Sequence, residues 1–202
     1  MSNPIRIILF DIGGVLVEFT GISSLQAWTG NRLTQDELWR KWLYSSFVRS
    51  FESGEIGPNT FADQLITEME LPVSRKEFIE AFSVWPKAVF PGAVEIISRI
   101  SSKYVRATLS NSNVIHWPRL MDEMGLRNLF AYHFASHLMG KLKPDREVFE
   151  HVVSVLKCEP SAILYLDDQS LNVEAAQLIG FQAVWVKEVQ EIERVLRDAN
   201  VL

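Results

Sequence analysis

Five charged or hydroxyl-bearing side chains follow apolar segments of this 202-residue chain or belong to its GKLKPD segment at residues 140–145. They are Asp11, Ser110, Lys143, Asp167 and Asp168. Several carboxylates that converge in one cleft repel each other unless a cation neutralises them. Oxygen-only ligands favour Mg²⁺, which binds one or two carboxylates together with waters and phosphate oxygens. These residue types therefore indicate metal-assisted chemistry on a phosphate group.

The apolar segments themselves predict the strands of a parallel sheet. Short β-branched runs that end in turn residues are typical of buried parallel strands. Four such runs and a weaker fifth lie at residues 5–10, 105–109, 162–166, 182–186 and 131–136. Helical patterns separate them at residues 92–102, 145–156 and 170–179. This alternation predicts an α/β fold with a doubly wound parallel sheet. Ligands bind such sheets at the carboxyl ends of the strands, where the polar side chains would meet.

The interval between residues 17 and 88 does not follow this alternation and is expected to be helical throughout. Two capping boxes, TQDE at 34–37 and SRKE at 74–77, each precede a helical pattern. The segment SGEIGPN at 53–59 separates two helices. We therefore expect a helical lobe, inserted after the first strand, in a core made of residues 1–16 and 89–202.

Composition excludes several classes of partner. Twenty basic against twenty-five acidic residues give a net charge of −5, so no basic surface for a nucleic acid is indicated. The single cysteine excludes an internal disulfide framework and is compatible with a reducing compartment. The first residues lack the features of a signal peptide, and no apolar run approaches the length of a membrane span. We expect a cytoplasmic protein without a nucleic-acid or membrane partner.

Four segments, taken in order, resemble the motifs of the haloacid dehalogenase (HAD) superfamily. They are DIGGV (11–15), TLSNS (108–112), KLKPD (141–145) and LYLDDQSLN (164–172). The resemblance covers essentially the whole chain. It implies a Rossmann-like core, with residues 17–88 as an α-helical C1 cap that closes over the substrate.

The resemblance implies a nucleophile and a metal site. Asp11 would be the nucleophile and would form an aspartyl-phosphate. Its carboxylate, the main-chain carbonyl of Gly13 and the Asp168 carboxylate would ligate Mg²⁺. Asp167 would be a further ligand or would hold the waters of the ion.

The resemblance also implies the residues that bind phosphate. Ser110 and the Asn111 amide would bind the phosphoryl oxygens, and Lys143 would neutralise both the phosphate and Asp11. Asn172 stands where the family often has a supporting polar residue. The implied activity is Mg²⁺-dependent hydrolysis of a small phosphorylated metabolite, with a sugar phosphate as the first expectation.

Gly13 departs from the usual pattern of the family's phosphatases. They carry a second aspartate at this position, which protonates the leaving oxygen and later activates water. Loss of a general acid costs about 10²–10⁴-fold in rate. A branch similar to the sugar-1-phosphate phosphatases also has glycine here, so an active enzyme is expected. Candidates to supply the missing group are Glu18, Arg49, Glu52 and Glu55.

Two other functions are compatible with the absence of an acid at this position. The family's 2-haloacid dehalogenases need no acid because halide leaves unprotonated, but they use no metal and replace the acid pair with a serine-rich stretch. The pair Asp167–Asp168 therefore argues against C–X bond cleavage. The other function is a catalytically weak protein that binds a phosphorylated ligand or a partner.

Some of these residues also have ordinary structural interpretations. Lys141 competes with Lys143 for the phosphate role, although the KPD context favours Lys143. Ser110 could cap a helix that begins near residue 113. Asp167 or Asp168 could cap the helix that follows them.

Overall fold

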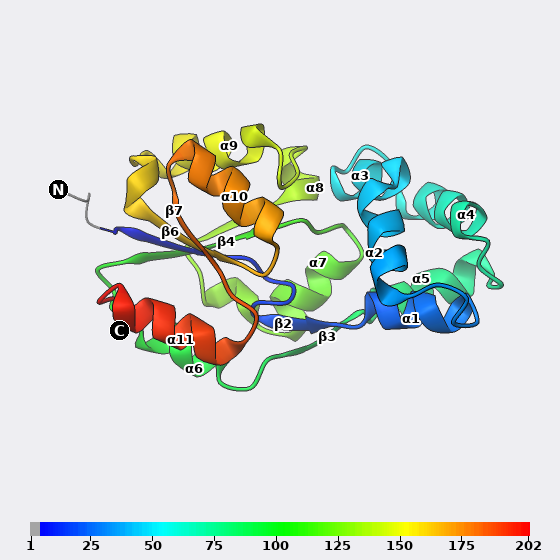
Figure 1. Cartoon of the computed structure of the whole chain (residues 1–202), viewed down its shortest axis with the longest axis horizontal. Helices are drawn as coiled ribbons and strands as arrows, with labels where there is room; N and C mark the ends of the chain where they lie inside the picture. Colours follow the sequence, from blue (N-terminus) through cyan, green and yellow to red (C-terminus); the bar gives the residue numbers. More distant parts are fainter. Residues whose placement is uncertain (1–4) are drawn as a thin grey trace.

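The computed structural model describes residues 5–202 and contains the expected parallel sheet, with its five strands in the order β5-β4-β1-β6-β7 (Figure 1). All four neighbouring pairs are parallel. The strands are β1 (Ile7–Phe10), β4 (Val105–Ser110), β5 (Tyr132–Ala135), β6 (Ile163–Asp167) and β7 (Gln182–Trp185). Each overlaps a predicted segment. Because β1 lies between β4 and β6, the chain winds outward in both directions, which confirms the doubly wound α/β fold.

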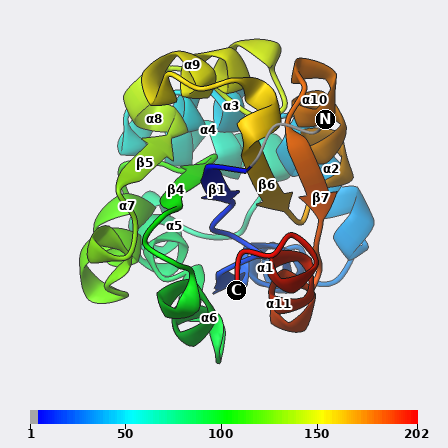
Figure 2. The same cartoon turned by 90° about the vertical axis from the view of Figure 1, so that its left-hand side faces the viewer.

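Helices cover both faces of the sheet. One face carries α6 and α11, and the other carries α9 and α10, as Figure 2 shows. These helices are α6 (Ala93–Arg99), α9 (Arg146–Leu156), α10 (Ser170–Ile179) and α11 (Val189–Asp198). Ile8 and Phe10 of β1 pack toward α6 and α11, whereas Ile7 and Leu9 pack toward α9 and α10. This alternation follows from the two-residue period of a strand, and it fixes β1 between two apolar layers.

Five further helices form a lobe to one side of the sheet (Figure 1). They are α1 (Gly21–Trp28), α2 (Gln35–Tyr44), α3 (Ser46–Glu52), α4 (Pro58–Met69) and α5 (Arg75–Ser83). Both predicted capping boxes are present, at Thr34 with Glu37 and at Ser74 with Glu77. The lobe has an apolar cluster of its own, in which Phe51, Phe61 and other aromatic rings stack.

The expectation of helices throughout residues 17–88 is wrong at both ends of that interval. There the chain forms two short strands, β2 (Val17–Phe19) and β3 (Pro86–Val89), which pair antiparallel. A three-residue strand is too short to show a period in the sequence, and its partner lies almost seventy residues away. The chain enters the helical lobe through β2 and returns to the sheet domain through β3.

Short elements complete the described chain: α7 (His116–Pro118), a π-helical turn (Arg119–Glu123), α8 (Ser136–Met139) and two 3₁₀ turns (Leu126–Asn128 and Pro160–Ala162). Within residues 5–202, no helix has the length and apolar character that crossing a bilayer requires.

Candidate active site

Three neighbouring strands in the middle of the sheet deliver polar side chains to one edge. Asp11 follows β1, Ser110 ends β4, and Asp167 ends β6. The backbone of Asp11 is held by a hydrogen bond from its N–H to the Leu166 carbonyl (2.9 Å). Carboxylate oxygens of Asp11, Asp167 and Asp168 all lie within 4.8 Å of one another. The structure therefore brings together the acids that the sequence analysis selected.

Lys143 places its ammonium between two of these acids. Its Nζ lies 2.9 Å from Asp11 Oδ1 and 2.7 Å from Asp167 Oδ2, and its side chain is 2% exposed. Burial disfavours the charge, but the two carboxylates outweigh it and raise the pKa of Lys143 above its usual value. Lys141 instead lies at the surface, with Nζ 3.8 Å from Glu147. Of the two lysines, Lys143 is the one at the site.

The side chain of Asn111 holds the backbone of Lys143. Asn111 Nδ2 donates to the Lys143 carbonyl (3.0 Å), and the Lys143 N–H donates to Asn111 Oδ1 (2.9 Å). This reciprocal pair fixes the segment between α8 and α9 against the end of β4. Asn111 therefore positions Lys143 with its side chain. The sequence alone does not reveal which way this side chain points.

Asp167 is fully buried and accepts hydrogen bonds at both oxygens. Lys143 Nζ, the Tyr165 hydroxyl and Asn172 Nδ2 donate to Oδ2, and the Gln169 N–H and Asn172 Nδ2 donate to Oδ1. Burial alone would raise the pKa of Asp167, but Lys143 and these donors lower it. Because its acceptor sites are occupied, Asp167 is suited to anchoring Lys143 rather than to binding a further cation.

Tyr165 is a site residue that the sequence analysis missed. Its hydroxyl donates to Asp167 from two positions upstream, and its ring is fully buried beneath Lys143. A signal was present, since residues i and i+2 of a strand share one face. A tyrosine two residues before a buried acid can supply such a donor.

Asp168 lies at the open side of the cluster. Its carboxylate occupies space that is free because Gly14 has no side chain. Gly14 has φ +73°, and a Cβ built there would overlap the Asp168 carboxylate. Gln169 Nε2 donates to Asp168 Oδ2 (2.9 Å). The N-cap residue of α10 is Gln169, so neither Asp167 nor Asp168 caps that helix. The glycine pair after Asp11 therefore does more than allow a turn, because it clears space for a carboxylate.

Ser110 is buried at the end of β4 and does not cap a helix. Its hydroxyl lies 3.5 Å from the Asn111 carbonyl. The first turn of α7 instead uses Asn113 Oδ1, which accepts from the N–H groups of Ile115 (3.1 Å) and His116 (3.0 Å). The helix-cap interpretation of Ser110 is therefore wrong, and its hydroxyl remains available at the site edge.

The charges of the cluster fit a divalent cation. Burial and the neighbouring acids raise the pKa of both Asp11 and Asp168, although Lys143 opposes this. Among the described residues, no lysine or arginine forms an ion pair with Asp168. Three carboxylates thus meet one ammonium, and all of the ligand atoms are hard oxygens, the donor set that Mg²⁺ prefers.

The ring of Phe19 packs beside Gly13, two residues after the nucleophile candidate Asp11. A Cβ on Gly13 would lie 3.3 Å from Cδ2 of Phe19, a ring that is 42% exposed. Phe19 also meets the His116 ring edge-on, with centroids 5.5 Å apart. An aromatic ring from β2 therefore lies beside the position where related phosphatases place an acid.

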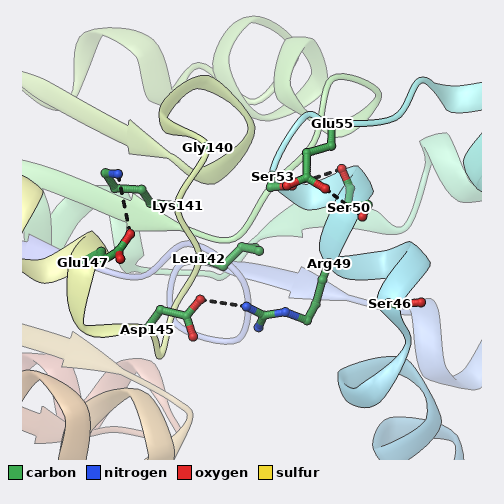
Figure 3. Close-up of a pocket in the computed structure, with 10 residues that line it drawn as sticks. All are labelled: Ser46, Arg49, Ser50, Ser53, Glu55, Gly140, Lys141, Leu142, Asp145 and Glu147. Atoms are coloured by element: carbon green, nitrogen blue, oxygen red, sulfur yellow. Dashed lines mark hydrogen bonds and ion pairs between the residues drawn. The ribbon is translucent and has the colours of Figure 1, made fainter.

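A cavity of about 340 Å³ opens between the helical lobe, at α3 and the residues just after it, and residues 140–147 (Figure 3), and its lining includes neither the three acids nor Lys143. Arg49 of α3 reaches across it to Asp145, with Nη2 2.7 Å from Oδ2. Gly54, just after α3, packs against the His137 carbonyl of α8. The lobe therefore lies against the segment that carries Lys143.

Comparisons with known proteins agree with the family resemblance seen in the sequence. The family model described as haloacid dehalogenase-like hydrolase matches residues 5–180. The sesquiterpene phosphatase astK of Aspergillus oryzae is 27% identical over 185 residues, which cover 89% of each chain. The D-ribitol-5-phosphate phosphatase of Bacteroides thetaiotaomicron is 25% identical over 88% of this chain and 90% of that protein.

Solved structures show the same fold. A HAD family enzyme from Bacteroides thetaiotaomicron superposes with a TM-score of 0.79 at 23% identity, over 96% of this chain and 100% of that chain. Its complex with magnesium and inorganic phosphate gives a TM-score of 0.73 at 25% identity, over 91% and 94% of the two chains.

Proposed function

Because the chain belongs to the haloacid dehalogenase-like hydrolases, we propose that this hydrolase is a Mg²⁺-dependent phosphatase that acts on small phosphate monoesters through a phosphorylated Asp11. The observation that carries the proposal is the contact between Asp11 and the buried ammonium of Lys143 inside a cluster of three acids. The relatives named as a sesquiterpene phosphatase and a D-ribitol-5-phosphate phosphatase support a small monoester as substrate. A sugar or polyol phosphate is our first choice.

In this proposal Asp11 attacks phosphorus and the bond to the leaving oxygen breaks. Lys143 holds Asp11 Oδ1, which orients the carboxylate and leaves its second oxygen to react. The Ser110 hydroxyl and Lys143 stabilise charge on the phosphoryl oxygens as the transition state forms. Water then attacks the aspartyl-phosphate, so that phosphate leaves and Asp11 is regenerated.

The carboxylates of Asp11 and Asp168 and the main-chain carbonyl of Gly13 would hold Mg²⁺. When bound, the ion neutralises phosphate charge and allows two anions to approach. Asp167, whose oxygens already accept hydrogen bonds, would hold Lys143 in place and contact waters of the ion. Gly14 would keep the Asp168 carboxylate within reach.

We also propose that residues 17–88 act as a cap. The lobe has its own apolar cluster, two short strands join it to the sheet, and α3 contacts the segment around Lys143. Closure of such a lobe excludes water and selects substrates by shape. The single cysteine and the acidic composition are consistent with an enzyme that acts on free metabolites in the cytoplasm.

The test is release of phosphate from a panel of sugar, polyol and aryl phosphates in the presence of Mg²⁺. We expect turnover that EDTA abolishes, that added Mg²⁺ restores and that Asp11→Asn removes. Turnover of a 2-haloacid that survives EDTA would instead favour the dehalogenase reaction. Failure to release phosphate from every member of the panel would favour a phospho-ligand-binding protein.

A further inference from the structure

The carboxylate of Asp168 has fewer side-chain partners than those of the other two acids. Asp11 contacts the ammonium of Lys143, and Asp167 accepts hydrogen bonds at both of its oxygens. Within residues 5–202, one side chain, that of Gln169, donates a hydrogen bond to the Asp168 carboxylate, from Nε2 to Oδ2 (2.9 Å). The position of Asp168 therefore depends strongly on how its main chain is held.

The main-chain carbonyl of Asp168 accepts a hydrogen bond from the indole of Trp185. The distance from Trp185 Nε1 to this oxygen is 2.7 Å, at the short end of the range for an N–H···O bond. Trp185 ends β7 and lies opposite Asp167 in the parallel register of β6 and β7. The Val186 N–H donates to the Asp167 carbonyl (3.1 Å). The end of β7 therefore holds both carbonyls of the acid pair, one through the backbone and one through a side chain.

The ring of Trp185 lies at the surface and is itself held in place. β7 is the outermost strand on its side of the sheet, and Trp185 is 49% exposed (Figure 2). Trp185 belongs to neither of the two apolar clusters that pack on the sheet. The ammonium of Lys187 lies over the ring, with Nζ 4.2 Å from the ring centroid, which is an attractive cation–π arrangement. The indole is thus a surface group whose N–H reaches inward to the acid cluster.

An indole suits this place better than a charged donor would. A lysine or arginine beside Asp168 would pair with the carboxylate and neutralise the charge that a cation needs. The indole N–H donates a hydrogen bond but carries no charge, and it uses the main-chain carbonyl rather than a carboxylate oxygen. Lys187, which lies over the ring, forms no ion pair with Asp168 in the part of the chain that the structure describes. Trp185 therefore restrains Asp168 without competing for its charge.

We propose that Trp185 is a positioning residue that orients Asp168 for Mg²⁺. This inference rests on the metal site of the proposed function. The indole N–H fixes the peptide group that follows Asp168, Gly14 leaves the space that the carboxylate occupies, and Gln169 holds Oδ2. Asp168 then loses little rotational freedom when it binds the cation, and partners of this kind strengthen metal binding without touching the metal.

The experiment is titration calorimetry with Mg²⁺ on the full-length wild type and on Trp185→Phe. Phenylalanine keeps an aromatic ring beneath Lys187 but has no N–H. We expect the Kd for Mg²⁺ to rise about 10–100-fold, as when other hydrogen-bond partners of metal ligands are removed. The measurement uses no substrate, so it does not depend on phosphatase turnover.

Trp39→Phe is the matched control. Trp39 lies on α2 of the helical lobe and is 38% exposed, so the same substitution removes a comparably exposed indole away from the acid cluster. This variant should bind Mg²⁺ as tightly as the wild type does.

The Mg²⁺ dependence of phosphate release distinguishes positioning from general damage to the site. If Trp185 acts only through Asp168, turnover by Trp185→Phe should recover to the wild-type rate once Mg²⁺ is raised above the weakened Kd. A displaced nucleophile or a displaced Lys143 would not be restored by more metal. Recovery at high Mg²⁺ also shows that the variant is folded.

The outcomes separate this inference from the proposed function. If the wild type binds Mg²⁺ and Trp185→Phe binds it equally well, the metal site stands and Trp185 does not position Asp168. The same conclusion follows if Trp39→Phe loses as much affinity, or if saturating Mg²⁺ leaves Trp185→Phe slow. If the wild type binds no Mg²⁺, the proposed metal site fails and the role of Trp185 fails with it. If the wild type binds Mg²⁺ but releases no phosphate, the phosphatase proposal fails, and the calorimetry still decides the role of Trp185.

Discussion

The carboxylate of Asp168 occupies the space that a side chain on Gly14 would need. We therefore expect Gly14→Ala to displace Asp168 and weaken Mg²⁺ binding at least tenfold, with a matching loss of turnover. The reason is steric, because the new Cβ and the carboxylate cannot share one position. Titration calorimetry with Mg²⁺, together with the Mg²⁺ dependence of phosphate release, measures both effects.

Gly125 provides the control for this change. Its φ is +74°, against +73° for Gly14, and a Cβ there would meet no atom within 4 Å. An alanine in this left-handed conformation costs about 1–2 kcal/mol at either position. Gly125→Ala should show that stability loss in urea but bind Mg²⁺ as the wild type does. Equal loss of Mg²⁺ affinity in both variants would show that backbone strain, not the Asp168 contact, is responsible.

Tyr165 supports the ion pair between Lys143 and Asp167. We expect Tyr165→Phe to lower the free energy of unfolding by about 1.5–3 kcal/mol, because a buried hydrogen bond to a charged group is lost. Urea unfolding at constant pH measures this change. In Tyr104→Phe, the lost hydroxyl donates to the Asn200 carbonyl at the exposed surface (3.1 Å). That control should change stability by less than about 0.5 kcal/mol, and equal losses in the two variants would argue against a special role for Tyr165.

The residues that gather at the sheet edge could be predicted from the sequence. Asp11, Ser110 and Asp167 each end a buried strand, and parallel strands present their carboxyl ends on one side. Apolar runs identify the strands, so the rule selects the acids without knowledge of side-chain positions. The choice of Lys143 over Lys141 also followed the sequence context.

Contacts that depend on three-dimensional packing could not be predicted in this way. The β2–β3 pair joins residues far apart in the chain, so no local pattern reveals it. The contact of Gly14 with Asp168 joins two loops. Glu55 lies three residues beyond the end of α3 (Ser46–Glu52) and is exposed, with a hydrogen bond from Ser50 Oγ to its carboxylate.

Restoring an aspartate at position 13 tests how the missing acid limits the reaction. We expect Gly13→Asp to raise kcat/KM on alkyl phosphates by at least tenfold and to change p-nitrophenyl phosphate little. The new Cβ would lie 3.3 Å from Phe19, and this partly exposed ring can shift by a few tenths of an ångström.

Gly13→Asn is the matched control, because asparagine has the size of aspartate but no acidic proton. It should leave kcat/KM on alkyl phosphates without the gain expected for Gly13→Asp. The same gain with Gly13→Asn, or an equal gain by Gly13→Asp on both ester classes, would contradict the leaving-group explanation.

His116 links the sheet domain to the helical lobe. Its surroundings favour the neutral form of the imidazole ring. Its Nε2 donates to the Phe82 carbonyl of α5 (2.7 Å), so its Nδ1 accepts from Asn113 Nδ2 (3.1 Å). Burial lowers the pKa of His116 to about 4, from an ordinary value of 6.5. The unfolded chain therefore binds a proton at pH values where the native ring does not. Its contribution to stability is complete above pH 6.5 and is lost progressively as the pH falls toward 4.

We therefore expect His116 to contribute about 2 kcal/mol to the loss of unfolding free energy between pH 7.5 and pH 5. Urea titrations of the wild type and of His116→Gln at several pH values measure this, because glutamine cannot titrate. The stability difference between the two proteins should shrink by that amount as the pH falls. His151→Gln, which removes a partly exposed histidine of α9, is the control for the loss of a histidine outside this contact. If His116→Gln instead runs parallel to the wild type, the native ring takes up a proton as readily as the unfolded chain does, and the hydrogen bond from Asn113 Nδ2 to Nδ1 does not keep it neutral.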